Sequence, residues 1–273
     1  MSEISTGSTP GELLEIAVRL ARDAAATARR MRDEAIGDVQ TKSTDTDVVT
    51  AADKAVERQV ADALLTQRPG DGLLGEEYGD AAPVAPGAVR WILDPIDGTV
   101  NYLYGLPQYA VSLAAEVDGT VVAGVVVNAA TGDEWTATRG GGAWRAGRRL
   151  TGSARTTLDQ SLVATGFGYD ARRREHQGAV LARLITRVRD IRRLGAAALD
   201  LCLVAEGTLD AYFEKGLNLW DHAAGGLIAE EAGLVVSGLS GAPAGNQMLV
   251  AAPPALFGAL HDALVELDAA GGA

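Results

Sequence analysis

The sequence predicts an α+β protein built from two closely packed subdomains. Two observations lead to this class. The first half of the chain carries two helical patterns and then several strands separated by short turns, as in an antiparallel meander. The second half alternates short apolar runs with helix-like stretches, which is typical of a layered α/β unit. Because the pattern changes near residue 150, we expect an N-terminal subdomain at residues 1–150 and a C-terminal subdomain at residues 151–273.

The N-terminal subdomain is expected to begin with two helices. Thr9 supplies a capping hydroxyl, a proline follows it, and Glu12 stands three residues after the cap. Apolar residues then recur at helical spacing, which predicts a helix over residues 10–35. A second helix is predicted to begin near Thr50, and we expect the polar segment 38–49 between the two helices to be a loop.

Strands follow in the first half, and strands alternate with helices in the second. The dipeptide Asp118-Gly119 strongly favours a two-residue hairpin turn. The predicted strands of the first half are residues 89–93, 109–117, 120–128 and 134–138. The predicted strands of the second half are residues 161–165, 190–194, 209–213, 234–237 and 248–251, and its predicted helices are residues 172–188, 196–206, 221–232 and 254–268.

Composition excludes several classes of protein. The net charge of −12 argues against nucleic acid as a passive electrostatic partner, and an anionic substrate would require divalent cations to bridge it to the protein. The single cysteine, Cys202, excludes an intrachain disulfide and a cysteine-based metal cluster. No apolar run approaches the roughly 18 residues that span a bilayer, and the start of the chain lacks the pattern of a signal peptide. We therefore expect a cytoplasmic protein with no membrane partner.

The segment DPIDGT, at residues 94–99, concentrates chemical groups at the end of a hydrophobic run. Turn chemistry explains its proline and glycine, but it does not explain the pairing of Asp94 with Asp97. Hard divalent cations take oxygen ligands, and the carbonyl of Ile96 could fill a further coordination position. A helix that starts at Thr99 would also offer the amides of Gly98 and Thr99 to a phosphate. The segment could therefore hold both a metal and an anion.

Two further acidic segments add to this chemistry. Glu76 and Glu77 follow an apolar pair at the end of a short predicted strand, and Asp221 stands where a helix begins, followed by small residues. Each has an ordinary structural explanation on its own, because glutamate pairs are usually solvated and aspartate often caps a helix. His222 is expected to have a structural role, and Cys202 is expected to lie in the core.

Taken together, the motifs resemble those of the inositol monophosphatase family along nearly the whole chain. The segments that carry the resemblance are GEE at 75–77, DPIDGTVN at 94–101, LGAAALDLCLVAEG at 194–207 and WDHAAG at 220–225. The resemblance implies a layered α-β-α-β-α sandwich of the sugar phosphatase type. It also implies dependence on Mg²⁺, sensitivity to lithium and a homodimer.

The resemblance further implies which residues bind metal. Glu76, Asp94 and the carbonyl of Ile96 would hold a first Mg²⁺, and Asp94, Asp97 and Asp221 would hold a second. Glu76 would help to bind a weaker third ion. The site would therefore contain two to three Mg²⁺ ions.

Catalytic and substrate-binding roles follow from the same resemblance. Thr99 would hydrogen-bond the attacking water and pair with Asp53, and Lys42 would lie near the waters of the third metal. The expected catalytic residues are thus Thr99, Asp53, Glu76 and Lys42. The expected substrate-binding residues are Gly98, Thr99, Gly195, Ala197, Glu214 and Asp221.

We expect the protein to hydrolyse myo-inositol monophosphate to inositol and phosphate with a metal-activated water. Glu214 is a suitable acceptor for polyol hydroxyls, although Lys215 could pair with it and weaken that role. Histidinol phosphate remains an alternative substrate, because nothing in the motifs separates it from inositol phosphate. The substrates 3′-phosphoadenosine 5′-phosphate and fructose 1,6-bisphosphate are less favoured, since the nearest basic cluster, Arg172 to Arg174, suits a solvated helix face. The non-enzymatic alternative is a binding or assembly protein that keeps the site as a relic.

Overall fold

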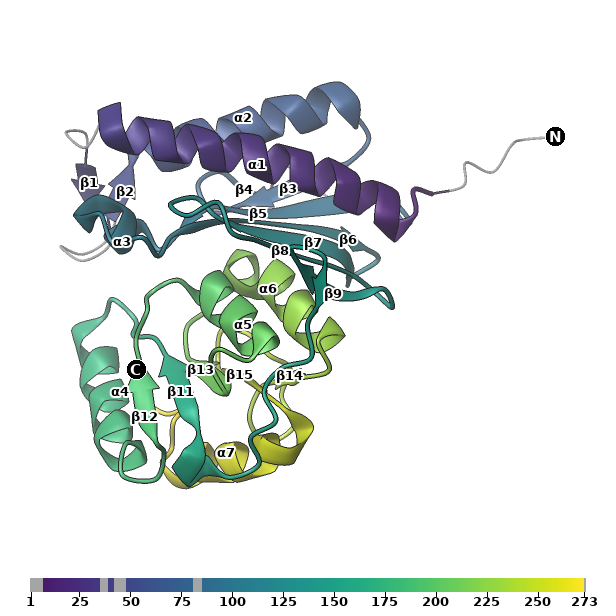
Figure 1. Ribbon diagram of the computed structural model, residues 1–273. Helices are drawn as coiled ribbons and strands as arrows, with labels where there is room; N and C mark the ends of the chain where they lie inside the picture. The colour runs from purple at the N-terminus through teal and green to yellow at the C-terminus, as the bar shows by residue number, and fades with distance from the viewer. Residues whose placement is uncertain (1–6, 35–38, 42–47, 81–84, 273) are drawn as a thin grey trace.

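The computed structural model describes residues 7–34, 39–41, 48–80 and 85–272, and these fold into five layers. Helices α1 (Pro10–Glu34) and α2 (Ala51–Gln67) cover the outer face of an eight-stranded sheet (Figure 1). Helices α5 (Ala197–Glu206) and α6 (Leu219–Glu231) form the central layer, beyond which lies a five-stranded sheet. Helices α4 (Ala171–Leu184) and α7 (Pro254–Glu266) cover the far side. The predicted α-β-α-β-α sandwich is confirmed.

The larger sheet is mostly antiparallel. Its strand order is β10-β9-β8-β7-β6-β5-β3-β4, and only the pairing of β3 with β5 is parallel. In the predicted hairpin turn, Asp118 and Gly119 both have positive φ, as a two-residue turn between twisted strands requires. The strands are β3 (Gly72–Gly75), β4 (Gly79–Asp80), β5 (Val89–Asp97), β6 (Ala110–Val117), β7 (Thr120–Asn128), β8 (Glu134–Thr138), β9 (Gly142–Arg145) and β10 (Arg148–Arg149).

The smaller sheet is mixed. Its strand order is β12-β11-β13-β15-β14, with β11 parallel to β12 and β13 and the remaining pairs antiparallel. A single turn of 3₁₀ helix at Leu158–Gln160 precedes the first of these strands. The strands are β11 (Leu162–Thr165), β12 (Asp190–Arg192), β13 (Ala211–Glu214), β14 (Val235–Ser237) and β15 (Leu249–Ala252).

Small residues let α6 approach the larger sheet and its neighbour α5 closely. A Cβ on Gly124 of β7 would lie 3.1 Å from the Cα of Ala224 in α6, which is tighter than ordinary packing allows. A Cβ on Gly225 would likewise lie 3.0 Å from the Cβ of Leu201 in α5. The buried core around α5 and α6 therefore joins side chains of both sheets into one cluster.

The predicted elements agree with the structure in most places. The short strands β4, β9 and β10 have no counterpart among the predicted strands, and two predicted segments differ from the structure. The segment 38–49 is not entirely a loop, because β1 (Val39–Thr41) and β2 (Val48–Thr50) pair in an antiparallel ladder. Valine and threonine dominate these two strands, and such β-branched residues favour extended backbone despite the polar residues around them. The strand predicted at residues 89–93 continues through Asp97 as β5. Among the helices described, none has the length and apolar content that a membrane crossing requires.

Candidate active site

A bulge in β5 determines the direction of the first two predicted metal ligands. Asp94 lies opposite Ser112 of β6 and Asp97 lies opposite Ala110, so β5 has one extra residue between these pairs. In a regular strand, residues three positions apart point to opposite faces. The extra residue in the bulge turns Asp94 and Asp97 to the same side of the strand, and both carboxylates line one pocket. Pro95 fits here because a bulge tolerates the loss of a ladder hydrogen bond.

Asp97 also joins the large sheet to the central layer. Its Oδ1 accepts a hydrogen bond from the N–H of Ala197 at 3.2 Å, and its Oδ2 accepts one from the N–H of Ala198 at 2.7 Å. These N–H groups lie in the first turn of α5 and have no partner within the helix. Burial raises the pKa of Asp97 to about 7, although both hydrogen bonds act to lower it.

Asn101 fixes the position of α3 (Thr99–Tyr104), the short helix after the bulge. Its buried Nδ2 donates to the carbonyl of Leu194 at 2.8 Å and approaches the carbonyl of Gly195 at 3.3 Å. The same nitrogen donates to the carbonyl of Gln108 at 2.7 Å. One side chain thus ties α3 to the segment that precedes α5.

Asp94 is almost completely buried among the clustered acids. Its Oδ1 has no hydrogen-bond partner among the described residues, and the residue is only 2% exposed. Burial raises the pKa of Asp94 well above its usual value. Four carboxylates add to this rise through their negative charge, those of Glu76, Asp97, Asp221 and Asp53. This cluster of like charges would be stabilised by a bound cation.

Glu57 on α2 supports the turn that carries Glu76. Its carboxylate is buried and accepts the N–H groups of Glu77 at 2.9 Å and Tyr78 at 3.0 Å. Glycine at residue 75 leaves room for this carboxylate, because a Cβ there would overlap it and displace Glu57. Glu57 carries no recognisable signal in the sequence, where it looks like an ordinary polar residue of an amphipathic helix.

Asp221 reaches the pocket from the start of α6. Its Oδ2 accepts the N–H of Asn218 at 2.6 Å, so one of its oxygens caps the helix. Burial raises the pKa of Asp221 well above its usual value, and the charge of Asp97 raises it further. Burial also lowers the pKa of the neighbouring His222 to about 4, so its imidazole is neutral near pH 7.

A cavity of about 210 Å³ brings these segments together. Its lining includes every predicted metal ligand and every predicted substrate-binding residue: Glu76, Asp94, Ile96, Asp97, Gly98, Thr99, Gly195, Ala197, Glu214 and Asp221. The walls therefore come from β5, α3, α5, α6 and the loops around them, which lie far apart along the chain.

The predicted catalytic pair is Thr99 and Asp53. Asp53 is buried near the start of α2, and its charge acts on Asp94. The hydroxyl of Thr99 donates to the carbonyl of Ile96 at 3.1 Å. The role of Asp53 stays a prediction. Lys42 lies outside the described residues.

Glu214 occupies the end of the pocket predicted to bind the polyol. Its Oε2 accepts the hydroxyl of Tyr212 at 2.6 Å, and Tyr212 is completely buried. Burial raises the pKa of Glu214, whereas this hydrogen bond and the charge of Arg193 lower it. Lys215 does not pair with Glu214, because its Nζ donates to the carbonyls of Gly271 and Gly272 near the end of the chain. The expectation that Lys215 competes for Glu214 is therefore not met.

Two arginines on the pocket wall correct a further expectation. Arg173 was expected on a solvated helix face, but it lines the pocket, whereas Arg172 is exposed. Arg193 also lines the pocket, just before Gly195. The sequence offered no periodic pattern that distinguished these two arginines from their neighbours.

The donors of the pocket fit Mg²⁺. One buried oxygen of Asp94 has no hydrogen-bond partner within the described parts of the chain, and such an oxygen favours a cation beside it. Within the described parts of the chain, no three His, Cys, Asp or Glu side chains are arranged so that they could hold one ion together. However, Mg²⁺ commonly binds through one or two carboxylates and keeps several waters. The carbonyl of Ile96 also has a second lone pair available beyond its bond to Thr99.

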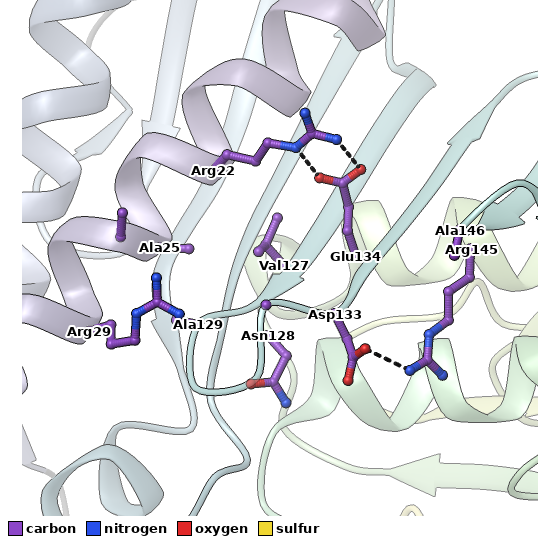
Figure 2. A pocket seen from close by; sticks show the side chains of 12 residues that line it. Arg22, Ala25, Arg29, Val127, Asn128, Ala129, Asp133, Glu134, Arg145 and Ala146 are labelled. Atoms are coloured by element: carbon purple, nitrogen blue, oxygen red, sulfur yellow. Dashed lines mark hydrogen bonds and ion pairs between the residues drawn. The ribbon is translucent and has the colours of Figure 1, made fainter.

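A second cavity, of about 440 Å³, lies between α1 and the β7–β8 turn and has different chemistry (Figure 2). Its two carboxylates are already engaged. Glu134 pairs with Arg22 through two contacts of 2.6 and 3.0 Å, and Asp133 pairs with Arg145 at 2.8 Å. These carboxylates are neutralised by arginine, unlike that of Asp94. The acidic pocket at the end of β5 is therefore the candidate active site.

The five-layered fold and this acidic pocket define a class of protein, and comparison of the chain with known proteins identifies that class. The sequence model of the inositol monophosphatase family matches residues 10–269. The chain therefore belongs to the inositol monophosphatase family, and this membership indicates that it is a phosphatase. Metal dependence is general in this family.

Individual relatives agree with this membership. The chain is 46% identical to "Inositol-1-monophosphatase SuhB" of Mycobacterium tuberculosis, in an alignment that covers 93% of this chain and 94% of the relative. The solved structure of Mycobacterium tuberculosis SuhB matches with a TM-score of 0.82 and 41% identity, over 97% of this chain and all of the other. "Nus factor SuhB" of Salmonella typhimurium is 38% identical over 230 residues, which cover 84% of this chain and 86% of the relative.

Proposed function

We propose that the protein is a Mg²⁺-dependent phosphomonoesterase that hydrolyses myo-inositol monophosphate to inositol and phosphate. The observation that carries this proposal is the meeting of four carboxylates with Glu214 in one pocket, where one buried oxygen of Asp94 has no hydrogen-bond partner among the residues that the structure describes. The acidic end suits metal and phosphate, and the other end offers a hydrogen-bond acceptor to a polyol. Relatives named inositol-1-monophosphatase support the choice of substrate.

The chain's own residues would hold the reactants as follows. Two to three Mg²⁺ ions would bind at Glu76, Asp94, Asp97, Asp221 and the carbonyl of Ile96. When bound, these ions would polarise the phosphate and make a nearby water more acidic. Thr99 and Asp53 would orient that water, and Lys42 would be a further catalytic residue.

The substrate would lie between two groups of residues. The N–H groups of Gly98 and Thr99 would donate to the phosphate, because Gly98 adopts a left-handed conformation at the start of α3. Gly195 and Ala197 would form a close wall beside the ring. Glu214 would accept hydrogen bonds from vicinal hydroxyls, held in place by Tyr212.

A metal and substrate experiment tests the proposal. The purified protein should release phosphate from myo-inositol 1-phosphate with Mg²⁺ present, lose this activity in EDTA and regain it when Mg²⁺ is restored. Asp94→Asn should reduce kcat by a factor on the order of 10³, because a removed group that stabilises transition-state charge has effects of this size. Asp62→Asn is the matched control, since Asp62 is exposed on α2 and remote from the pocket lining.

The outcomes separate the candidate substrates. Undiminished turnover in EDTA, or by Asp94→Asn, would refute the metal mechanism. A panel with histidinol phosphate, 3′-phosphoadenosine 5′-phosphate and fructose 1,6-bisphosphate tests the alternatives. A kcat/KM that is much higher for histidinol phosphate than for inositol phosphate would replace the preferred substrate.

A non-catalytic role is the second candidate function, because one relative at 38% identity is named a Nus factor. The protein could serve such a binding role in addition to catalysis. Deletion of the gene in the source organism, followed by complementation with Asp94→Asn, separates the two roles. Rescue of growth by this variant would assign the essential function to a binding role.

Other properties of the protein are proposed on the same basis. We propose a cytoplasmic homodimer, and the exposed apolar side chains of Tyr104 at the end of α3 and Leu106 just after it suit a subunit contact. Lithium inhibition and the division into residues 1–150 and 151–273 are part of the same proposal. Size-exclusion chromatography with light scattering tests the dimer.

A further inference from the structure

The segment at residues 268–272, just after α7, is held against α4. The side chain of Ala269 is buried and belongs to the same core cluster as Val180 of α4 and Phe213 of β13. The Nε2–H group of His176, also on α4, donates to the carbonyl of Asp268 at 2.8 Å. The 268–272 segment is therefore fixed in place by packing and by a hydrogen bond.

Lys215 connects this segment to the candidate active site. It follows Glu214 at the end of β13, and it lines both the candidate active site and a small cavity that is also lined by Ala269. Its Nζ donates to the carbonyl of Gly271 at 2.8 Å and to that of Gly272 at 3.1 Å. Two backbone carbonyls thus hold a cation whose neighbour in the chain is the carboxylate of Glu214.

Glycine at residue 272 allows this arrangement. Its backbone is left-handed, with a φ of 79°, a conformation that favours glycine. A Cβ on Gly272 would lie 2.7 Å from Cγ of His176, closer than atoms in contact can approach. A larger residue at this position must therefore shift the 268–272 segment or the imidazole, and the carbonyls that hold Lys215 shift with the segment.

A released Lys215 would compete with the substrate for Glu214. Lysine carries its charge on a flexible four-carbon stem, so an ammonium group without its carbonyl partners can turn toward the adjacent carboxylate. Because Glu214 is only partly exposed, the attraction between the two charges is screened less than it would be on the surface. A carboxylate that is paired with an ammonium group offers fewer lone pairs to the hydroxyls of a polyol.

We propose that the 268–272 segment is a positioning element for polyol recognition, which keeps Lys215 from pairing with Glu214. This inference rests on the proposed phosphatase function. Glu214 accepts hydrogen bonds from the polyol while the carbonyls of Gly271 and Gly272 hold the ammonium group. The segment acts on polyol binding and leaves the reacting phosphate unaffected, because the metal-binding carboxylates belong to other parts of the pocket.

A double-mutant cycle tests the proposal. Gly272→Val should raise the KM for myo-inositol 1-phosphate about tenfold, because the hydroxyls lose a charged acceptor. The kcat, and the KM for p-nitrophenyl phosphate, which has no polyol, should change by less than about twofold. In the Lys215→Met background, which has no ammonium group to release, Gly272→Val should change the KM for the inositol substrate by less than about twofold.

Another left-handed glycine supplies the matched control. Gly241 has a φ of 82°, no described atom beyond its neighbours in the chain lies within 4 Å of the position of its Cβ, and it does not line the pocket. Gly241→Val introduces similar backbone strain and should leave both KM values unchanged. His176→Ala removes the hydrogen bond to Asp268 while residue 272 stays glycine. It should raise the KM for the inositol substrate in the same direction, and the cycle is repeated with it if Gly272→Val does not fold.

The results distinguish the segment's role from the proposed function. A KM for myo-inositol 1-phosphate that is unchanged in both Gly272→Val and His176→Ala overturns the inference and leaves the proposed function intact. An equal rise with and without Lys215→Met also overturns it, because the segment then acts through packing alone. If the wild-type protein releases no phosphate from myo-inositol 1-phosphate, the proposed function fails and this inference fails with it.

Discussion

Removing one buried hydroxyl should separate polyol recognition from phosphate chemistry. Tyr212 is completely buried under the polyol end of the pocket, and its hydroxyl donates to Oε2 of Glu214 at 2.6 Å. Tyr212→Phe keeps the ring and its packing but removes this donor. Glu214 then keeps its burial and loses a group that holds its carboxylate in one orientation. The reacting phosphate is held elsewhere in the pocket and should be affected little.

The size of the effect follows from the hydrogen bond. A hydrogen bond to a charged group contributes about 1.5–3 kcal/mol. If the misaligned carboxylate of Glu214 loses about 1.4 kcal/mol of binding free energy, the substrate binds tenfold more weakly. We expect the KM for myo-inositol 1-phosphate to rise about tenfold, with a much smaller change for p-nitrophenyl phosphate. The free energy of unfolding should fall by about 1–3 kcal/mol, because a buried acceptor loses its partner.

The pH dependence of the same variant has a definite sign. Burial raises the pKa of Glu214, and the hydrogen bond from Tyr212 lowers it. Removing that bond must therefore raise the pKa further. Because the ionised carboxylate is the better acceptor, the KM defect for the inositol substrate should grow as the pH falls from 8 toward the raised pKa. A defect that shrinks over this range would contradict the reasoning.

A second tyrosine provides the control. Tyr102 is also buried, and its hydroxyl donates to the carbonyl of Ala28 at 3.0 Å, away from the pocket lining. Tyr102→Phe should lower stability without changing the ratio of the two KM values. Steady-state kinetics and urea unfolding of both variants complete the assay. If Tyr212→Phe and Tyr102→Phe change the two substrates alike, Tyr212 has only a packing role.

Two further predictions concern the catalytic end of the pocket. Asn101→Ala should lower the free energy of unfolding by about 1–3 kcal/mol and reduce kcat, because the Leu194 carbonyl loses its hydrogen-bond donor and α3 is no longer bonded to that segment. Urea unfolding and steady-state kinetics measure the two effects, and an unchanged kcat would show that Asn101 does not position α3. If Asp53 accepts a proton during the reaction, Asp53→Asn should reduce kcat by about 10²–10⁴-fold while Mg²⁺ still binds. Calorimetric titration with Mg²⁺ and steady-state kinetics check this, and a loss within about threefold, small beside that range, would leave Asp53 with only a structural role at the helix start.

The elements that the sequence predicted are those with a local cause. The capped start near Thr9 and the hairpin at Asp118 each depend on residues a few positions apart, and both are present in the structure. The ordered motifs likewise predicted one pocket, because each of them ends or begins an element. All of their predicted metal and substrate residues line that pocket.

The features that the sequence could not reveal depend on contacts between distant segments. Glu57 resembles a solvated helix residue until the turn at residue 77 closes over it. Arg173 and Arg172 differ only in which side of α4 meets the pocket, and a short helix rich in arginine gives no periodic pattern that distinguishes them. The bulge in β5 is set by its pairing with β6, which no single-strand pattern contains.

The bond between Asp97 and the start of α5 makes catalysis depend on the assembly of the whole molecule. A carboxylate from one sheet completes a helix that packs between both sheets, 100 residues further along the chain. A fragment that ends before residue 197 would keep Asp94 and Asp97 but would lack the helix that orients Asp97, as well as Glu214 and Asp221. Hydrolytic turnover is therefore a reporter of the complete fold. During denaturation, it should disappear in the same transition as the tertiary structure and not survive in a partly folded intermediate.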